Sequence, residues 1–592
     1  MEFLNTGFPP ILVSLLFLVL ILAVCHGVGR RALNGIGWGK TTLFPIERMI
    51  FSAAIGLIMM ALAVLVLGLA GFLNPWVFRA GLIVLLVFFG RPFPEISFRL
   101  KEKQAWFFAA AAVTALFLSF LDCGRPPIGN DALAYHLADP KDFILKGRIY
   151  PIPFSRESLW PYQTEMLFTL GLLLEGTTLA QLMHWAFYPL TSLALYAFGS
   201  RFLSRRVGFL AAIIFIFTPV VFNESSQAYV DLSLAFFIFL SFYAFCLKDS
   251  VGPGLSALFS GILCGAAAST KYLGLSAVAI LAAFWIFERP SRIKSILLFG
   301  GGVFLVSAVW YGRSYLHLGN PVYPFFSNFF GGRGFEFGVR TGLGMGDGLT
   351  GFLFLLWNIT FFPNRFGGDW LGPLYLMFAP LALFYFREWK KQMIYLGAFV
   401  FLYGLFFFKT AVQARYFLPA IPFLSLIAAF VLARLETAQK FLSRWTAFII
   451  AGVISIHLGM DFYKTRDSWG LLIQKETAAH FLSRKERSFR GYQYLNQAPP
   501  PAKIFGAVEP RRFYNGQPNL LVDGEPLRRF LTGQKQSISG FLAREKFDYI
   551  WVSSLTEPEI QEFLRRPDYR LGFSYDFEEG GTLFQYRIYQ RH

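Results

Sequence analysis

The chain has 592 residues, of which 55% are hydrophobic, 18% aromatic and only 15% charged, and its mean hydropathy is +0.49. Soluble globular chains carry about 25% charged residues, so this composition excludes a large soluble enzyme and a disordered chain. The formal net charge of +18 could suit nucleic acid, but basic residues also gather in the cytoplasmic loops of membrane proteins. We therefore expect membrane lipid as a partner, and no nucleic acid.

The apolar runs predict a polytopic α-helical membrane protein, since a helix crosses the hydrocarbon core with about 20 residues. In chain order the predicted spans are 9–28, 44–72, 75–90, 105–121, 180–203, 207–222, 229–247, 255–271, 273–288, 294–312, 371–386, 392–408, 415–434 and 444–461. This makes fourteen transmembrane helices. One further apolar stretch, at about 157–176, is expected to be an interfacial or re-entrant helix, because counting it as a span would reverse every later loop.

The loops between these spans predict the orientation. One alternating set of loops holds 20 Lys and Arg residues, whereas the short loops of the other set hold only Arg79, Lys409 and Arg415. The positive-inside rule makes the first set cytoplasmic and puts both termini outside.

This topology divides the chain into four parts. Residues 1–121 are N-terminal transmembrane helices, 122–179 a first outer loop with interfacial helices, and 180–461 a transmembrane core that includes the outer loop 313–370. Residues 462–592 are more charged and contain strand-like runs, AKIFGAV at 502–508 and FDYIWVSS at 547–554, around a helical pattern at 537–547. Strands that alternate with helices predict a small extracytoplasmic α/β domain.

The informative polar residues gather at the outer ends of the spans. The first outer loop contains GNDALAYHLADPKDFILKG, in which Asp131, Tyr135, Asp139 and Asp142 are spaced for one face of a helix that starts at Asn130. His136 and Lys141 lie among them. A second interpretation is that Asn130 or Asp131 only caps the helix, because Asx side chains satisfy the free N–H groups of a helix start.

Further charges stand at later outer turns. Asp231 enters an apolar run in AYVDLSLAFF, which is costly unless the carboxylate has a partner or a task; a structural salt bridge or a cap is the alternative. Lys271, Arg313 and Arg415 lie at the ends of other spans, where each alone could merely extend to lipid headgroups. Several cations and two acids on one side of the membrane together indicate a site for an anionic, membrane-borne substrate.

At these motifs the chain resembles the polyprenol-phosphate-dependent GT-C glycosyltransferases, in particular bacterial relatives of protein O-mannosyltransferases and lipid A aminoarabinose transferases. The resemblance extends from about 122 to 425 and includes NDALAYHLADPKDFILKG, RFLSRRVGFLAAIIFIFTP, GAAASTKYLGL, WYGRSYLHLGNPVYPF and RYFLPAIP. It implies a GT-C helical bundle. It also implies an enzyme that moves a sugar from a polyprenyl-phosphate donor to a glycan, lipid or protein acceptor.

The resemblance also implies roles for single residues. Asp131 matches the acid of the first outer loop and Asp231 a second acid at the outer end of a later span, so these are the expected catalytic residues. Lys271, Arg313 and Arg415 correspond to the cations that hold the lipid-linked phosphate; His136, Asp139 and Asn320 complete the expected substrate-binding set. The chain departs from the family in three additional leading spans and in the lack of an adjacent Asp-Asp or Asp-Glu pair in the first loop.

The chemistry fits these residue types independently. A sugar on a polyprenyl phosphate already has a good leaving group, so the protein must deprotonate a hydroxyl and neutralise the departing phosphate. A single base would invert the anomeric centre, whereas Asp231 as a nucleophile would give retention. No metal ligand set and no certain cofactor is expected, and a divalent metal is left open.

Two other functions compete with this one. A transporter or lipid flippase is the main alternative, but transporters place their charges near the midplane in repeated halves. A non-enzymatic scaffold would not require Asp and Lys at the membrane boundary. We therefore expect a glycosyltransferase of the bacterial inner membrane whose active site faces the periplasm or exterior.

Overall fold

The computed structural model describes residues 8–38, 43–90, 103–152, 155–288, 292–331, 348–410, 413–438, 440–499, 501–507, 511–517, 520–522, 527, 531, 534–579 and 581–592. Within them, eight helices are long and apolar enough to cross a membrane. They are α1 (Phe8–Gly35), α2 (Pro45–Leu69), α4 (Lys103–Asp122), α13 (Pro253–Thr270), α15 (Arg292–Leu318), α20 (Lys391–Thr410), α21 (Ile421–Ala438) with the preceding 3₁₀ turn η6 (Ala414–Ala420), and α22 (Lys440–Leu472). The chain is a polytopic α-helical membrane protein, as predicted.

The six remaining predicted spans are shorter or broken. Three are apolar helices of 14 to 16 residues, α3 (Pro75–Phe89), α11 (Asp231–Cys246) and α14 (Gly274–Phe287). The span 180–203 consists of α7 (Thr177–Trp185) and α8 (Phe187–Phe202), and 207–222 consists of α9 (Arg205–Ile216) and α10 (Pro219–Ser225), bent by 64°. The prediction of a spanning helix at 371–386 is wrong, because this interval forms the short helix α19 (Leu374–Phe378) and the 3₁₀ segment η5 (Pro380–Glu388).

Proline explains two of these breaks. Pro219 opens α10, and Pro380 opens η5. A proline lacks the N–H that would continue the preceding helix, and its ring clashes with the carbonyl four residues earlier. Short helices complete the part of the chain before the C-terminal domain. They are α5 (Ala138–Lys146), α6 (Gln163–Leu174), α12 (Lys248–Val251), α16 (Ser327–Phe330), α17 (Leu349–Leu353) and α18 (Leu355–Phe361), with the turns η2 (Ala132–His136), η3 (Glu157–Leu159) and η4 (Pro363–Phe366).

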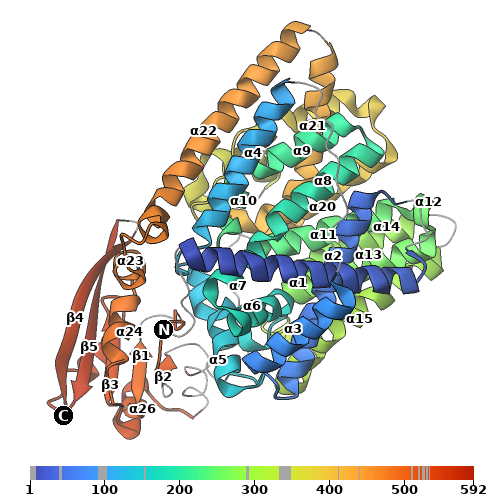
Figure 1. Cartoon of the computed structure of the whole chain (residues 1–592). Coiled ribbons are helices and arrows are strands. Elements are labelled where there is room, and N and C mark those ends of the chain that lie inside the picture. Colours follow the sequence, from blue (N-terminus) through green and yellow to red (C-terminus); the bar gives the residue numbers. More distant parts are fainter. Residues whose placement is uncertain are drawn as a thin grey trace.

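The helix α6 corresponds to the apolar stretch expected to be interfacial or re-entrant. It has 12 residues, all of them buried, and is too short to cross a bilayer. Figure 1 shows it beneath α1, beside α7 and α5. An apolar helix surrounded by protein is tolerated at this position because its neighbours cover its polar backbone ends.

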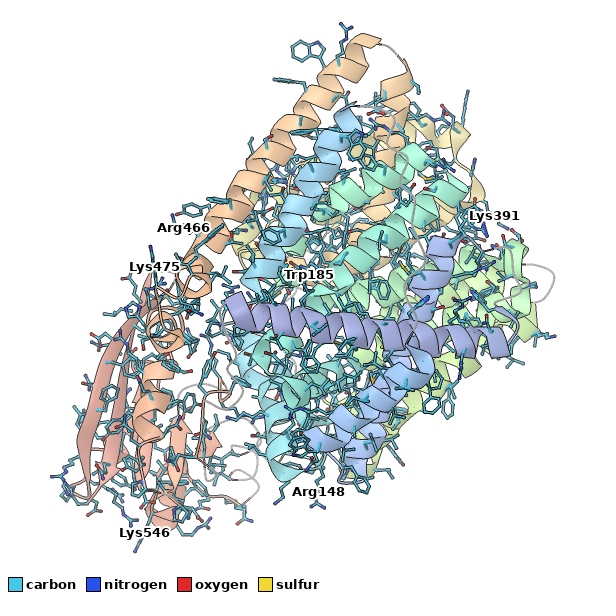
Figure 2. All side chains as sticks on the ribbon, in the orientation of Figure 1. Arg148, Trp185, Lys391, Arg466, Lys475 and Lys546 are labelled. Carbon is cyan, nitrogen blue, oxygen red and sulfur yellow. The ribbon has the colours of Figure 1, made fainter. Side chains whose placement is uncertain are left out.

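The loops of the basic set gather at one end of the bundle. Arg201 pairs with Glu47, Arg206 with Glu436, and both Lys248 and Lys391 with Glu288. Figure 2 shows Lys391 at the end of the molecule remote from Lys475 and Lys546 of the C-terminal domain. These basic loops thus lie close to one another, at an end of the bundle remote from the C-terminal domain.

Residues after α22 form the expected small α/β domain. Its sheet has the order β2-β1-β3-β5-β4, built from β1 (Ile504–Ala507), β2 (Leu520–Val522), β3 (Tyr549–Ser553), β4 (Tyr569–Glu579) and β5 (Thr582–Arg591). The strand β1 is parallel to β2 and β3, whereas β5 is antiparallel to β3 and β4. The helices are α23 (Ala478–Lys485), α24 (Phe489–Leu495), α26 (Ile538–Glu545) and α27 (Pro558–Phe563).

Alternation along β3 shows why helices cover both faces of the sheet. Tyr549 and Trp551 belong to the core continuous with α24, and Ile550 and Val552 to the separate core with α26 and α27. The helix α22 continues past the expected boundary at 462 to Leu472 and connects this domain to the bundle (Figure 1).

Candidate active site

The first outer loop does not form the continuous helix expected from its spacing. A wide π-helical turn, η2, covers Ala132–His136, and α5 starts again at Ala138. The wider turn changes the angle between successive residues, so the prediction that Asp131, Asp139 and Asp142 share one helix face is wrong. The capping interpretation of Asp131 is also wrong, because its side chain makes no cap hydrogen bond.

Asp131 instead forms an ion pair across the fold. Its Oδ2 lies 2.6 Å from a guanidinium nitrogen of Arg415, and the two side chains are 16% and 8% exposed. Asn130 donates to the other carboxylate oxygen at 3.0 Å. Burial alone would raise the pKa of Asp131, but the charges of Arg415 and His136 and these hydrogen bonds outweigh it and hold that pKa well below the usual value of a carboxyl group.

A second ion pair lies beside the first. Lys271 Nζ is 2.8 Å from Asp231 Oδ1, and the Asp231 side chain is only 1% exposed. Within the described chain, Asp231 Oδ2 has no hydrogen-bond partner. The Tyr416 ring faces both cations, with Lys271 Nζ 4.3 Å and Arg415 Cζ 5.3 Å from its centroid. The salt-bridge interpretation of Asp231 is therefore observed, and it coexists with one unsatisfied carboxylate oxygen.

His136 brings a third acid to this group, which the sequence did not single out. Its Nδ1 is 2.7 Å from Glu165 Oε1, with both side chains almost fully buried. Glu165 Oε2 lacks a partner in the described part of the protein, and so does Oε2 of buried Glu224 on α10. The sequence signal for Glu165 is an acid that directly precedes the apolar run MLFTLGLLL of α6.

The structure thus brings together Asp131, His136, Asp231, Lys271 and Arg415 of the expected set. We call these five residues, with Glu165 and Glu224, the acid–base cluster. Asp231 is the first residue of α11, Lys271 directly follows the last residue of α13, and Arg415 lies in η6. The cations of such a cluster are of the kind that bind anionic groups, and its acids are of the kind that bind hydroxyl groups.

The other three expected residues have separate surroundings. Asp139 is fully buried and is held by Arg512, by Ser155 Oγ at 2.9 Å and by Tyr162 OH at 2.8 Å. Arg313 donates to the Ser158 carbonyl and borders a cavity of about 360 Å³ with Leu69 and Leu316. Asn320 is buried in a turn, where it bonds to the Phe325 carbonyl and the Val322 N–H at 2.9 Å each.

No group of three or more His, Cys, Asp or Glu side chains in the described ranges is arranged to hold a metal ion. The chemistry of the cluster is that of acids, a histidine and two cations. Such groups can accept a proton from a hydroxyl and neutralise a leaving phosphate.

Comparison with known proteins agrees with this interpretation. Residues 175–300 match the family model for dolichyl-phosphate-mannose-protein mannosyltransferase. The fold is similar to ArnT from Cupriavidus metallidurans bound to undecaprenyl phosphate, at 13% identity and a TM-score of 0.54 over 82% of this chain and 98% of that one. The apo state of that ArnT gives 14% identity and a TM-score of 0.55 over 82% and 97%. No curated protein sequence matches the chain.

These findings confirm the fold expected from the sequence. The chain shares the overall fold of that ArnT. The segment that matches the mannosyltransferase family model, 175–300, contains Asp231 and Lys271.

Proposed function

We propose that the protein transfers a sugar from a polyprenyl-phosphate donor to a hydroxyl group of an extracytoplasmic glycan, lipid or protein. The observation that carries this proposal is the double ion pair Asp131–Arg415 and Asp231–Lys271, with two cations and two acids at one end of the bundle. The family match and the fold similarity to an undecaprenyl-phosphate-binding protein support the choice of donor.

In this proposal Lys271 and Arg415 bind the donor phosphate, and Asp131 is the base. The acceptor oxygen attacks the anomeric carbon while its proton passes to Asp131. The bond from that carbon to the phosphate oxygen breaks, and the electron pair stays on the phosphate, where the two cations neutralise it. With one base the reaction inverts the anomeric centre.

The ion pairs give Arg415 a second task. While Arg415 pairs with Asp131, the carboxylate is ionised but weakly basic, because its pKa is held low. A donor phosphate that takes over Arg415 removes this restraint, so the pKa of Asp131 rises towards its usual value. Donor binding would then strengthen the base only when there is a sugar to transfer.

The orientation and the site roles belong to this proposal too. We place the acid–base cluster on the periplasmic or outer side of a bacterial inner membrane, since the basic loops lie at the opposite end. In this proposal Arg313 contributes to the donor site from the cavity that it borders. Asp139 and Asn320 hold the outer loops in which they lie. The four-part division of the chain is part of the same proposal, with the start of the outer domain moved from 462 to the end of α22 at Leu472.

The experiment that tests the function compares envelope glycans, lipids and glycoproteins by mass spectrometry with and without the protein. Loss of one sugar from one acceptor identifies both substrates. The purified protein should then transfer that sugar from a synthetic polyprenyl-phosphate donor. Identical glycan, lipid and glycoprotein profiles, with no transfer in vitro, would exclude the proposed activity.

A further inference from the structure

The C-terminal domain reaches into the first outer loop with one segment, residues 511–517, which we call the clamp segment. It is fixed within its own domain, since Asn496 accepts from the Gly516 N–H at 2.7 Å and donates to the Tyr514 carbonyl at 3.1 Å. Gln517 donates to the Leu495 and Ala498 carbonyls. The segment is therefore a rigid projection of the domain.

Arg512 anchors the clamp segment to α5. It pairs with both Asp139 and Asp142, and its side chain is only 7% exposed. A buried guanidinium requires such carboxylate partners, because an unpaired charge at this depth is strongly unfavourable. The two acids, three residues apart on α5, thus form a binding site for an arginine of the C-terminal domain.

Backbone contacts continue this attachment around η2. In the wide turn the Leu137 N–H bonds to the Ala132 carbonyl at 2.9 Å, and the Leu133 carbonyl accepts the Phe513 N–H at 3.1 Å. Lys141 Nζ donates to the carbonyls of Phe513 and Asn515. Tyr514 OH donates to the Pro127 carbonyl at 2.6 Å. The clamp segment therefore contacts the chain on both sides of Asp131.

Arg511 makes the contact nearest to the acid–base cluster. Its Nε donates to Asn130 Oδ1 at 2.9 Å, and the Asn130 amide donates to Asp131 Oδ1 at 3.0 Å. Arg511 is itself held by Glu486 and Glu579 of the C-terminal domain, at 3.4 and 3.5 Å. Because Arg511 occupies the Asn130 oxygen, the amide nitrogen of Asn130 is directed at Asp131.

We propose that the clamp segment completes the active site from the C-terminal domain, and that Arg511 is a positioning residue that orients Asp131 through Asn130. The inference rests on the proposed function, in which Asp131 is the base. Before the donor binds, Arg415 holds one carboxylate oxygen of Asp131 and Asn130 the other. Once the donor phosphate takes Arg415, the hydrogen bond from Asn130, itself held by Arg511, keeps Asp131 oriented. The domain is part of the catalytic unit and not a separate binding module.

The test uses Arg511→Met in the full-length protein and measures kcat, the donor KM and the pH profile of transfer. A small misplacement of a catalytic group can cost about 100-fold, so we expect kcat to fall about 10- to 100-fold with little change in the donor KM. The acid limb of the kcat profile should also move to higher pH. Asn130 no longer favours the ionised form of Asp131, while the other groups around it, Arg415, His136, Tyr135 and Tyr229, stay in place.

Two further variants separate positioning from stability. Arg487→Met is the matched control, because Arg487 also pairs with Glu579 but within the C-terminal domain; it should lower thermal stability similarly and leave kcat and the pH profile unchanged. Asn130→Ala breaks the same connection from the loop side. It should reproduce both the kcat loss and the shifted acid limb, even if Arg511→Met does not fold.

The outcomes distinguish this inference from the proposed function. If Asp131→Asn abolishes transfer while Arg511→Met and Asn130→Ala keep the wild-type kcat and pH profile, the positioning inference is wrong and the base remains. If kcat falls but the acid limb of the pH profile does not shift, Arg511 has only a structural role and does not orient Asp131. Full transfer by Asp131→Asn would instead show that Asp131 is not the base, and the proposed function of this residue would be wrong.

Discussion

Replacing Asp131 by Asn should remove transfer without unfolding the protein. The substitution keeps the shape of the side chain and abolishes its basicity. A general base contributes about 10²- to 10⁴-fold to the rate, so kcat should fall by a factor in this range. Asp131→Glu, which keeps the carboxylate but displaces it, should retain more activity than Asn.

The structure sets the accompanying loss of stability. Removing one partner of a buried ion pair costs about 3 to 5 kcal/mol. Here Arg415 keeps a hydrogen bond to Gln413 Oε1 at 2.6 Å and the face of Tyr229, 4.8 Å from its guanidinium carbon. The new amide oxygen can still accept from Arg415, so we expect a loss of about 1 to 3 kcal/mol. Since the pKa of Asp131 is depressed in the folded state, the wild-type advantage should be present above about pH 4 and disappear as the pH falls below it.

The matched control is Asp122→Asn at the same end of the bundle. Asp122 pairs with Arg125 at 3.0 Å, with side-chain exposures of 9% and 13%, close to those of the Asp131 pair. It should lose similar stability and keep its rate of transfer. The assay is transfer from a polyprenyl-phosphate sugar, followed by mass spectrometry, together with thermal unfolding of each variant. Near wild-type transfer by Asp131→Asn, or an equal loss in Asp122→Asn, would refute the catalytic role.

Two further predictions concern the donor site and the topology. Lys271→Ala should raise the donor KM by roughly 10- to 150-fold, because a charge-assisted hydrogen bond is worth about 1.5 to 3 kcal/mol. Arg313→Ala should raise the donor KM less. If neither substitution changes the donor KM, these two cations do not bind the donor. A cysteine introduced at Arg205 should react with an impermeant reagent only after the membrane is opened, while tags at both termini should be accessible in intact cells. Labelling of that cysteine from outside would reverse the orientation.

The bundle was predictable from the sequence because lipid-facing helices need long apolar runs, which hydropathy records directly. The segment 371–386 is equally apolar but contains Pro373 and Pro380, and it folds as a short helix and a 3₁₀ segment. Apolarity measures transfer into lipid, whereas helix continuity depends on backbone N–H groups that proline lacks. The same distinction explains the bend at Pro219.

The site was predictable only in part. The predicted topology put Asp131, Asp231, Lys271 and Arg415 at the same end of the bundle. It could not predict which of them form ion pairs, because Asp131 and Arg415 are far apart in the sequence. The spacing argument for Asp131, Asp139 and Asp142 failed because a regular helix was assumed where a π-helical turn occurs. Arg511 and Arg512 were missed because the charged C-terminal domain carries no pattern that points to the membrane.

The pairing of Asp131 with Arg415 leads to a last prediction, in which one substitution has opposite effects on binding and on rate. An anionic donor must compete with the Asp131 carboxylate for Arg415, since the two groups lie 2.6 Å apart. Asp131→Asn removes this competitor, so polyprenyl phosphate without a sugar should bind more tightly, by roughly 5- to 150-fold for about 1 to 3 kcal/mol. The gain should shrink in high salt, because screening weakens the electrostatic part of binding. Titration of the lipid into wild type, Asp131→Asn and the control Asp122→Asn would measure it. Equal affinities in all three would mean that Arg415 does not bind the donor phosphate, whatever role Asp131 has in the transfer.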